Sequence, residues 1–380
     1  MKTINISRVL RLLWQKKGIT RIDIAEKLSL DKSTITKIMN ILLDRQFVLE
    51  MSEGEAGPQG GRKPIHLTIN KDFGCVAGFE VQPNYWKLIV VNLEGDMVYT
   101  HTQATQINAD NIIPVLIDAV GFLKTKMDEL NKKLIGIGIG ASGIMNPQRG
   151  IINQSIPLQI NTPVDILTPL SEHIDVPLYL DNDANCGAWG ELAFHKSPHL
   201  QNFIFLLIEI REDEIIQKKF GGLAVGLGVV LNNKVYYGSS FSAGEFRSVF
   251  SKKEDINQFS LHIDDVVSIN RKRETFIRFA DEIAENIALL VNVLNVSNVF
   301  IAHINVHFHD VLIPILEKTI QEKSPYQMQP PCVITNSSYG EEAVAYGAAG
   351  IILEHIFAHP EIPQSSERKV IDPIDIILTI

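Results

Sequence analysis

The sequence is poor in cysteine and has no long apolar run. Its three cysteines, Cys75, Cys186 and Cys332, lie far apart and form no CxxC pair, which argues against a disulfide framework and is typical of a reducing compartment. The longest apolar runs, such as FIFLLI at 203–208, are too short to span a bilayer. The amino-terminal stretch MKTINISRVLRLLWQKKG lacks the apolar core of a signal peptide. We therefore expect a cytoplasmic protein without a membrane partner.

Positive charge is scarce over most of the chain. The net charge is −9, but residues 1–70 hold 12 Lys and Arg against 7 Asp and Glu, and the other 310 residues hold 23 against 37. A basic end on an acidic body favours contact of that end alone with a polyanion. A surface that is unevenly charged but only solvated gives the same counts, so the charge distribution alone does not establish a polyanion as the partner. A chain of 380 residues is long enough for two or three domains.

Three amphipathic helical patterns follow one another at the amino end. Thr20 is placed to cap the second pattern and Asp31 to cap the third. The third helix turns Ile35 and Leu42 inward and offers short polar or cationic side chains on its opposite face. Such a helix suits the major groove of DNA. The residues expected to contact DNA there are Lys32, Ser33, Thr34, Thr36, Lys37 and Asn40.

Residues 47–70 have the pattern of a strand, a Gly-rich loop and a strand. This pattern predicts a wing, with Arg62 and Lys63 beside its tip, able to reach phosphates or a minor groove. A helix-turn-helix followed by a basic wing favours DNA binding over the alternative, a three-helix protein-interaction module. The order resembles the winged-helix domains of sugar-operon repressors, and the ending GGRKPIHLTIN is especially similar to theirs.

The rest of the chain repeats one pattern of strands and helices. Three strand-like runs between residues 75 and 103 are followed by a long amphipathic helix, a buried strand, the strand VPLYLDN and a helix start. A second cycle runs from FIFLLIEI at residue 203 to a last helix from Glu341. The same order of elements therefore occurs twice: three strands, a helix, a strand, a helix and a strand. Such a repeat is a duplicated α/β pattern. Two such lobes normally leave a cleft between them.

Three segments of this body carry a family resemblance: GIGIGASGIMNPQRGII (136–152), LDNDANCGAWGE (180–191) and GLGVVLNNKVYYGSSFSAGE (226–245). Their order and spacing make residues 75–355 similar to the ROK family (repressors, open reading frames and kinases). With the winged helix in front, the chain resembles the xylose and N-acetylglucosamine repressor branch. The resemblance implies an α/β fold class, an N-terminal winged helix-turn-helix followed by a two-lobed actin/hexokinase-like (duplicated RNase H-like) ROK body.

The domain boundaries follow from this resemblance. We expect a winged helix-turn-helix DNA-binding domain at 1–70, a first ROK lobe at 71–190, a second ROK lobe at 191–355 and a C-terminal tail at 356–380.

The resemblance also implies what a ROK kinase needs. Such a kinase typically has Asp-x-Gly-Gly-Thr after its first strand, a turn whose backbone amides admit the ATP phosphates. In this sequence the corresponding segment is FEVQPN (79–84). Glu80 stands at the position of the Asp, and Gln82, Pro83 and Asn84 replace Gly-Gly-Thr. Proline removes an amide donor, and side chains occupy the phosphate space. The second phosphate loop, GGLAVGLG (221–228), is only half kept. We expect no kinase activity, no catalytic residue and no cofactor.

The sugar side of the family site is kept in part. Asn182 and Asp183 match the family's sugar-contacting pair, and Glu245 matches the Glu of its Gly-Glu-x-Gly-His segment. Arg247 and Ser248 replace the Gly-His, and the zinc cysteines that follow in the family are missing. We expect no metal. The histidines at 303, 307 and 309 form an alternative cluster, in which His307 and His309 are expected to share a strand face.

Asp183 has two readings, a ligand contact and the cap of the helix that begins at Ala184. The readings are compatible, because a cap at a strand's carboxyl end also lies at a cleft mouth. We expect Asp183 to contact a polyol without performing chemistry, because a base without a phosphoryl donor transfers nothing. The first motif also departs from the family, which normally has Pro where Ser142 stands.

These observations predict a transcriptional regulator, most simply a repressor, of carbohydrate-utilisation genes. Its partners would be operator DNA, a sugar or sugar-derivative effector held between the lobes, and further copies of the chain in a homodimer or a dimer of dimers. Two alternatives stay open: a ROK-type sugar kinase with a DNA-binding head, and a regulator whose body is a non-binding dimer scaffold. The charged insert at 209–220 and the tail from Pro360 have no predicted role.

Overall fold

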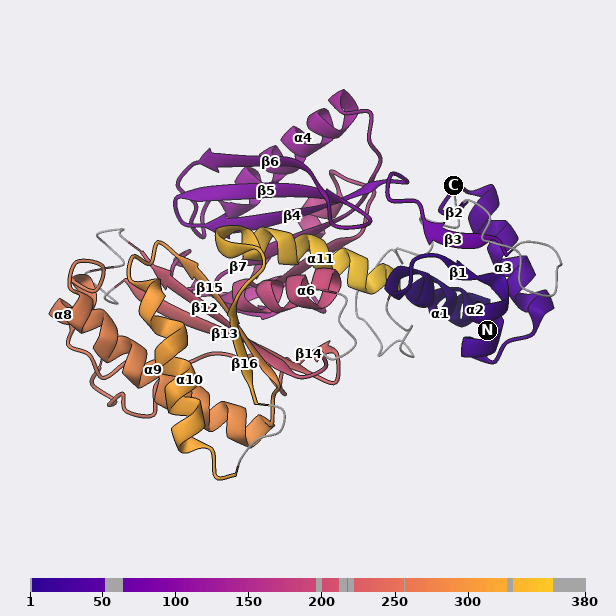
Figure 1. Cartoon of the computed structure of the whole chain (residues 1–380). Coiled ribbons are helices and arrows are strands. Elements are labelled where there is room, and N and C mark those ends of the chain that lie inside the picture. Colours follow the sequence, from indigo (N-terminus) through magenta and orange to yellow (C-terminus); the bar gives the residue numbers. More distant parts are fainter. Residues whose placement is uncertain are drawn as a thin grey trace.

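The computed structural model describes residues 2–51, 64–195, 200–211, 217, 222–255, 257–326 and 331–357. A small N-terminal domain lies beside a larger body that contains two five-stranded β-sheets (Figure 1). In these described ranges no helix is both long and apolar enough to cross a membrane.

The N-terminal domain is a three-helix unit with a small antiparallel sheet, as the sequence predicts. The periodic apolar residues of the helices, with Phe47 and Val48, are buried together. The strands lie in the order β1-β3-β2. Residues 52–63, which include the predicted wing tip with Arg62 and Lys63, lie outside the described residues. The elements are α1 (Lys2–Gln15), β1 (Ile19–Thr20), α2 (Arg21–Leu28), α3 (Lys32–Asp44), β2 (Val48–Glu50) and β3 (His66–Ile69).

The two predicted helix caps have different outcomes. Thr20 forms a complete capping box, in which its side chain accepts from the amide of Asp23 and the Asp23 carboxylate accepts from the Thr20 amide. Asp31 occupies the N-cap position of α3, but its side chain makes no capping hydrogen bond. The Asp31 carboxylate is therefore left at the exposed start of α3.

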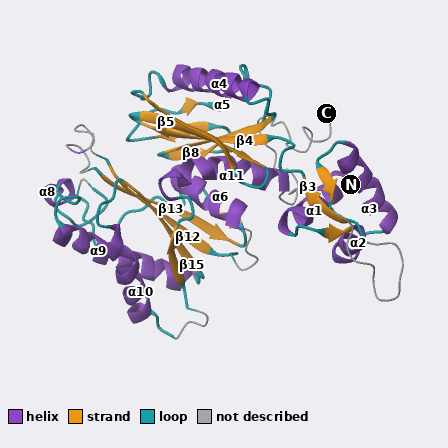
Figure 2. Cartoon of the chain, turned by 45° about the horizontal axis from the view of Figure 1, so that its top comes forward, coloured by secondary structure: helices purple, strands orange, loops and turns teal. Residues whose placement is uncertain are grey.

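The first sheet of the body has the strand order β11-β7-β4-β5-β6. Helices α4 and α5 cover one of its faces (Figure 2). Its elements are β4 (Cys75–Gln82), β5 (Tyr85–Asn92), β6 (Met97–Ala104), α4 (Ile112–Glu129), β7 (Leu134–Ala141), α5 (Leu167–Ser171) and β11 (Leu178–Asn182). A small sheet at its edge contains β8 (Ile144–Asn146), β9 (Ile151–Gln154) and β10 (Val164–Asp165).

The second sheet has the strand order β16-β15-β12-β13-β14, which matches β11-β7-β4-β5-β6 strand by strand. This repeat confirms the predicted duplication. Helices α9 and α10 cover its outer face (Figure 2). Its elements are β12 (Phe203–Ile210), β13 (Leu223–Leu231), β14 (Lys234–Val235), α8 (Ile263–Val267), α9 (Arg273–Leu294), β15 (Asn298–Ile304), η1 (His309–Val311), α10 (Leu312–Lys323), β16 (Val333–Asn336) and η2 (Gly340–Glu342).

The last helix of each half packs against the sheet of the other half. Helix α6 (Asp183–His195) follows β11 but contacts β12 and β13, whereas α11 (Ala343–Phe357) follows the second sheet but contacts β4 and β7. The predicted boundaries at 190 and 355 therefore fall inside these two helices. A Cβ on Gly347 would lie 1.6 Å from the carbonyl oxygen of Cys186, so the α6–α11 crossing requires glycine there.

Helix α11 also joins the body to the N-terminal domain (Figure 1). Phe357 at its end is fully buried and stacks on Trp14 of α1, with ring centroids 4.7 Å apart. One apolar core runs from the N-terminal helices through Phe357 and Ile352 to Val76 of the first sheet. Lys17 and Glu94 add an ion pair of 2.9 Å between the same domains. The DNA-binding candidate and the body are thus packed together in this structure.

Candidate ligand pocket and nucleic-acid interface

A pocket of about 420 Å³ lies between the two halves of the body. It brings together the three predicted sugar contacts, Asn182, Asp183 and Glu245. Asn182 and Asp183 stand where β11 ends and α6 begins, and Glu245 comes from the segment after β14. Parallel strands of the first sheet point their carboxyl ends here, which is where open α/β sheets bind ligands.

Asp181 and Asn182 stabilise the junction between β11 and α6 through hydrogen bonds. The buried carboxylate of Asp181 accepts from Tyr237 Oη, Trp189 Nε1 and Asn185 Nδ2. The Asn182 side chain donates to the Gly143 carbonyl at 3.0 Å, and its Oδ1 accepts from the amide of Ala184 at 2.9 Å. Asn182 therefore caps the start of α6. The cap predicted for Asp183 is confirmed beside it, because Asp183 Oδ1 accepts from the same Ala184 amide at 2.8 Å.

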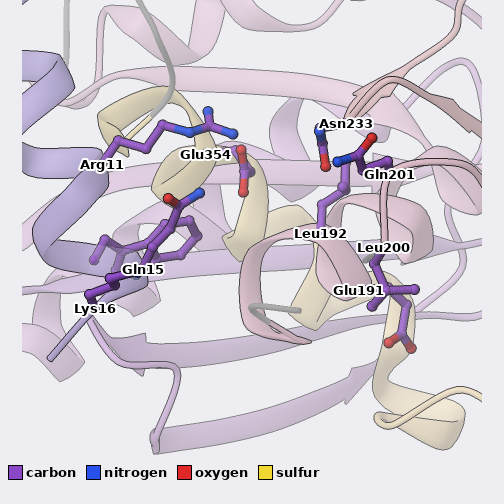
Figure 3. A pocket seen from close by; sticks show the side chains of 10 residues that line it. Arg11, Gln15, Lys16, Glu191, Leu192, Leu200, Gln201, Asn233 and Glu354 are labelled. Carbon is purple, nitrogen blue, oxygen red and sulfur yellow. The ribbon is translucent and has the colours of Figure 1, made fainter. Parts of the chain in front are cut away.

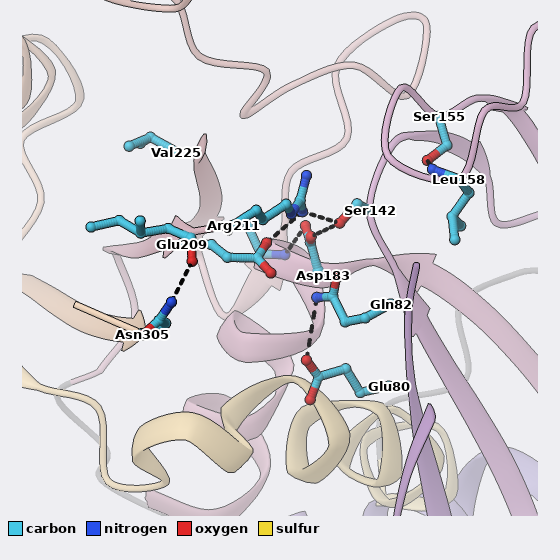
Figure 4. Close-up of polar contacts among 12 residues, drawn as sticks. Glu80, Gln82, Ser142, Ser155, Leu158, Asp183, Glu209, Arg211, Val225 and Asn305 are labelled. Carbon is cyan, nitrogen blue, oxygen red and sulfur yellow. Dashed lines mark hydrogen bonds and ion pairs between the residues drawn. The ribbon is translucent and has the colours of Figure 1, made fainter. Parts of the chain in front are cut away.

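Asp183 is buried and lies in a chain of polar contacts that crosses the pocket (Figure 4). Ser142 Oγ donates to Asp183 Oδ2 at 2.6 Å. Arg211 Nη2 donates to Ser142 Oγ at 2.8 Å and forms an ion pair with Glu209. Burial raises the pKa of Asp183, and Glu209 adds to the rise, whereas the Ser142 hydrogen bond and Arg211 oppose it. The carboxylate can accept a hydrogen bond from a ligand hydroxyl.

Glu245 lies at the mouth of the same pocket with an exposed side chain. Loss of water around the carboxylate raises the pKa of Glu245, and the negative charge of Asp183 raises it further. Arg247 also lines the pocket, but its guanidinium donates to Ser251 Oγ and to the carbonyls of Lys252 and Asp255. Asp183 and Glu245 therefore face the pocket as two hydrogen-bond acceptors.

The first hairpin offers little room for a phosphate. Gln82 pairs directly with Tyr85, so the turn between β4 and β5 consists of Pro83 and Asn84. Glu80 is fully buried, accepts from Tyr85 Oη at 2.8 Å and lies 3.8 Å from Lys87 Nζ. Burial raises the pKa of Glu80 to about 7. Of the residues that replace the Gly-rich turn implied by the family resemblance, Gln82 is buried, Pro83 is half-buried and Asn84 is exposed.

The His cluster does not form a ligand set. His303 stacks on His309 with ring centroids 4.2 Å apart, and His307 Nδ1 lies 3.2 Å from the Asn270 carbonyl oxygen. The expected shared strand face for His307 and His309 is wrong, because β15 ends at Ile304 and His309 begins a 3-10 turn. In the described parts of the chain, no group of three or more His, Cys, Asp or Glu residues could hold a metal ion.

The third helix of the N-terminal domain presents the predicted DNA-contacting residues. Lys32, Ser33, Thr36, Lys37 and Asn40 are exposed, and Thr34 is half-buried. The inward face of α3 buries Ile35, Ile38, Met39 and Leu42. Thr36 Oγ1 donates to the Lys32 carbonyl at 2.8 Å, which leaves the hydroxyl oxygen as an acceptor. The exposed face can therefore donate and accept hydrogen bonds along a groove.

A second pocket, of about 310 Å³, lies where α1 meets the body (Figure 3). Arg11 of α1 and Glu354 of α11 point into it from opposite sides. Burial raises the pKa of Glu354 to about 7, and Arg11 opposes the rise. This pocket belongs to the junction between the two domains.

Sequence reasoning missed the residues that make the polar contacts across the first pocket, Ser142, Glu209 and Arg211. Ser142 carried a signal, because it stands where the family normally has proline. Glu209 and Arg211 belong to the charged insert, which had no predicted role, and residues 212–216 and 218–220 of that insert lie outside the described residues. The contact between Arg211 and Ser142 depends on how the two halves meet, and local sequence patterns do not contain that information.

Comparisons with known proteins agree with this architecture. Residues 76–249 match the ROK family and residues 3–51 match the MarR family. The chain is 23% identical to the xylose repressor of Bacillus subtilis (strain 168), over 93% of this chain and 96% of that protein. Among solved structures, a ROK family transcriptional regulator described as a homolog of the E. coli MLC protein superposes with a TM-score of 0.73, at 19% identity, covering 94% of this chain and 96% of that one.

A ROK family glucokinase from Streptomyces griseus, solved with glucose and AMPPNP, superposes on the body alone. Its TM-score is 0.56 at 17% identity, and the alignment covers 73% of this chain and 99% of that chain. The body therefore has the fold of the ROK proteins, and the winged helix is an addition in front of it. The chain is therefore similar to the ROK family over residues 76–249, and this segment follows a MarR-type match over residues 3–51.

Proposed function

We propose that this protein is a sequence-specific DNA-binding repressor of carbohydrate-utilisation genes, with a sugar effector between its lobes and no kinase activity. The observation that carries the proposal is the exposed polar face of α3 in a winged-helix domain that shares one apolar core with a two-lobed body. The relatives named xylose repressors support the same function over nearly the whole chain.

The proposed DNA contacts are the predicted residues of α3, together with Arg62 and Lys63 of the wing. Removing two phosphate-contacting cations flattens the dependence of binding on salt by about two units of slope. We therefore expect Arg62→Ala with Lys63→Ala to weaken binding to all DNA and to reduce that slope. Unchanged salt dependence would exclude these two residues from phosphate contact.

The proposed effector contacts are Asn182, Asp183 and Glu245. Asp183 and Glu245 offer acceptors for sugar hydroxyls, and Asn182 lines the same pocket while its Oδ1 accepts from the amides of Ala184 and Asn185. The two-residue turn of the first hairpin, Pro83 and Asn84, lacks the glycines of a phosphate turn. Asp183→Asn should weaken the effector response and leave operator affinity nearly intact. If operator affinity collapses instead, the role of Asp183 is structural.

We further propose a cytoplasmic homodimer. Two winged helices about one DNA turn apart (~34 Å) read a palindromic site, so a rotation of the lobes can release DNA. Exposed apolar side chains on α9, Leu289 and Val293, support a second copy as the partner of this face. Changing both to Glu should convert the dimer to a monomer in light scattering, whereas Tyr326→Glu, an exposed control, should not.

The first experiment is selection of binding sites. The purified protein is incubated with sheared DNA from its own source, and the retained DNA is sequenced. Enrichment of a few palindromic sites beside sugar-uptake or catabolic genes supports the proposal. Release of those sites is then measured with D-xylose, chosen because of the named relatives, and with D-glucose and N-acetyl-D-glucosamine. Retention without a preferred site, or no retention, contradicts a specific operator.

A sugar kinase is the second candidate, favoured by the position of Asp183 in the pocket of a kinase-like fold. Sugar-dependent ADP production measures it directly. We expect none, because a base without a bound phosphoryl donor transfers nothing.

A further inference from the structure

The effector pocket contains its own ion pair. Glu209 is the next-to-last residue of β12 and Arg211 follows that strand, and both side chains are about nine-tenths buried. A charged pair is costly to bury unless its geometry and hydrogen bonds compensate for the lost water. Arg211 meets this requirement with Glu209 on its own half and Ser142 on the other half (Figure 4).

Among the lining residues that the structure describes, each cation already has a partner. The acids are Asp183, Glu209 and Glu245, and the cations among the described lining residues are Arg211 and Arg247. Arg211 is neutralised by Glu209, and Arg247 is bound to backbone carbonyls and Ser251. A phosphate or carboxylate entering here would meet uncompensated Asp183 and Glu245.

Both hydrogen bonds that Arg211 donates to Ser142 and Glu209 come from Nη2. Within the described part of the chain, its buried Nε has no hydrogen-bond partner. A guanidinium binds phosphate oxygens with two parallel N–H donors when no other anion occupies them. Glu209 is the anion that pairs with this guanidinium, through Nη2, in the described structure.

From these contacts we infer that the Glu209–Arg211 ion pair sets the charge class of the effector. While Glu209 holds Arg211, the pocket accepts an uncharged polyhydroxy compound and rejects its phosphate ester. Removal of the Glu209 charge turns Arg211 into a phosphate-binding residue. This inference rests on the proposed effector site and deepens it.

The experiment compares three proteins by thermal melting and calorimetry: the wild type, Glu209→Gln, and Glu209→Gln with Arg211→Met. The probes are D-xylose, D-glucose, D-glucose 6-phosphate and inorganic phosphate. The double variant measures the general stabilising effect of phosphate salts, which act on all proteins by exclusion from their surface. Arg273→Met, which removes the exposed ion pair with Asp310, is the control for losing an arginine outside the pocket.

We expect inorganic phosphate and the phosphate ester to bind Glu209→Gln at least about tenfold more tightly than the wild type. The double variant should lose this gain, and Arg273→Met should behave as the wild type. Equal phosphate binding by all proteins, or no gain in Glu209→Gln, overturns the inference. A phosphate gain that persists in the double variant overturns it as well, since Arg211 would not be responsible.

The two proposals fail separately. If no sugar stabilises the wild type, the proposed effector function is contradicted for those sugars, while inorganic phosphate still tests the ion pair. If the wild type binds D-glucose 6-phosphate as tightly as D-glucose, the effector function stands and the charge class inferred here is wrong.

Discussion

The two halves of the body share one strand order but differ in the hairpin after the first strand. In the first half, Pro83 and Asn84 alone join β4 to β5. In the second half, β12 runs into Arg211, and β13 begins only at Leu223. Duplication has thus preserved the sheet, whose order is fixed by its core, and has left the hairpins at the pocket free to diverge.

The same comparison shows two ways to bury a carboxylate. Glu80 in the first half lies 3.8 Å from its nearest cation, and burial raises its pKa to about 7. Glu209 in the second half is paired directly with Arg211. One half therefore buries a group that is easily protonated, and the other buries a charge with its counter-ion.

The largest expected loss of stability concerns α6 and α11, each of which packs against the sheet of the other half. Gly347→Ala would place Cβ against the Cys186 carbonyl, a backbone atom that cannot move without separating α11 from α6. We expect a loss of at least about 4 kcal/mol in the free energy of unfolding, measured with urea. Gly121→Ala, where a Cβ would meet nothing within 4 Å, should be neutral or stabilise by about 1 kcal/mol. Equal results for both would contradict a tight crossing.

The second effect tests the lone carboxylate of the first half. A glutamate whose folded pKa is about 7, above its ordinary 4.5, contributes stability at low pH that is lost as pH rises through 7. Glu80→Gln should therefore gain up to about 3 kcal/mol relative to wild type between pH 5 and pH 8. Urea unfolding at several pH values measures this difference. If the free energy of unfolding depends on pH in the same way for Glu80→Gln and for the exposed control Glu129→Gln, burial of Glu80 does not shift its pKa as described.

A smaller effect is expected where Tyr237 of the second half donates to Asp181 of the first. Tyr237→Phe leaves the buried carboxylate with one donor fewer, which costs about 1.5–3 kcal/mol. Tyr236→Phe is the matched control, because Tyr236 is 52% exposed. Thermal melting of the two variants should differ clearly; equal melting temperatures would mean that this contact does not join the halves.

The smallest effect concerns Ser142, which links Arg211 to Asp183 across the pocket. Ser142→Ala should cost about 1 kcal/mol of stability and weaken the effector response several-fold, because Asp183 loses its fixed orientation. The exposed Ser171→Ala serves as control. A normal effector response in Ser142→Ala would show that the pocket does not need this link.

Much of the fold was predictable because its signals are local. The apolar spacing of α3, the capping box at Thr20 and the alternation of strands and helices depend on residues a few positions apart. The duplicated halves follow from the repeated order of these elements. The meeting of Asn182, Asp183 and Glu245 at one pocket was also predicted, and their contact with a sugar stays a prediction.

The sequence by itself determined the winged helix and the duplicated sheets, since both depend on short-range spacing. The replacement of a Gly-rich turn by Gln82, Pro83 and Asn84 follows from the resemblance to the family. Only the tertiary structure decided that α6 and α11 exchange sheets, that Asn182 caps α6, and that Arg211 lies between Glu209 and Ser142. Ser142 and Arg211 are 69 positions apart and belong to different halves. Their contact exists because packing of the two halves buries both side chains together, and burial makes each polar group require a partner.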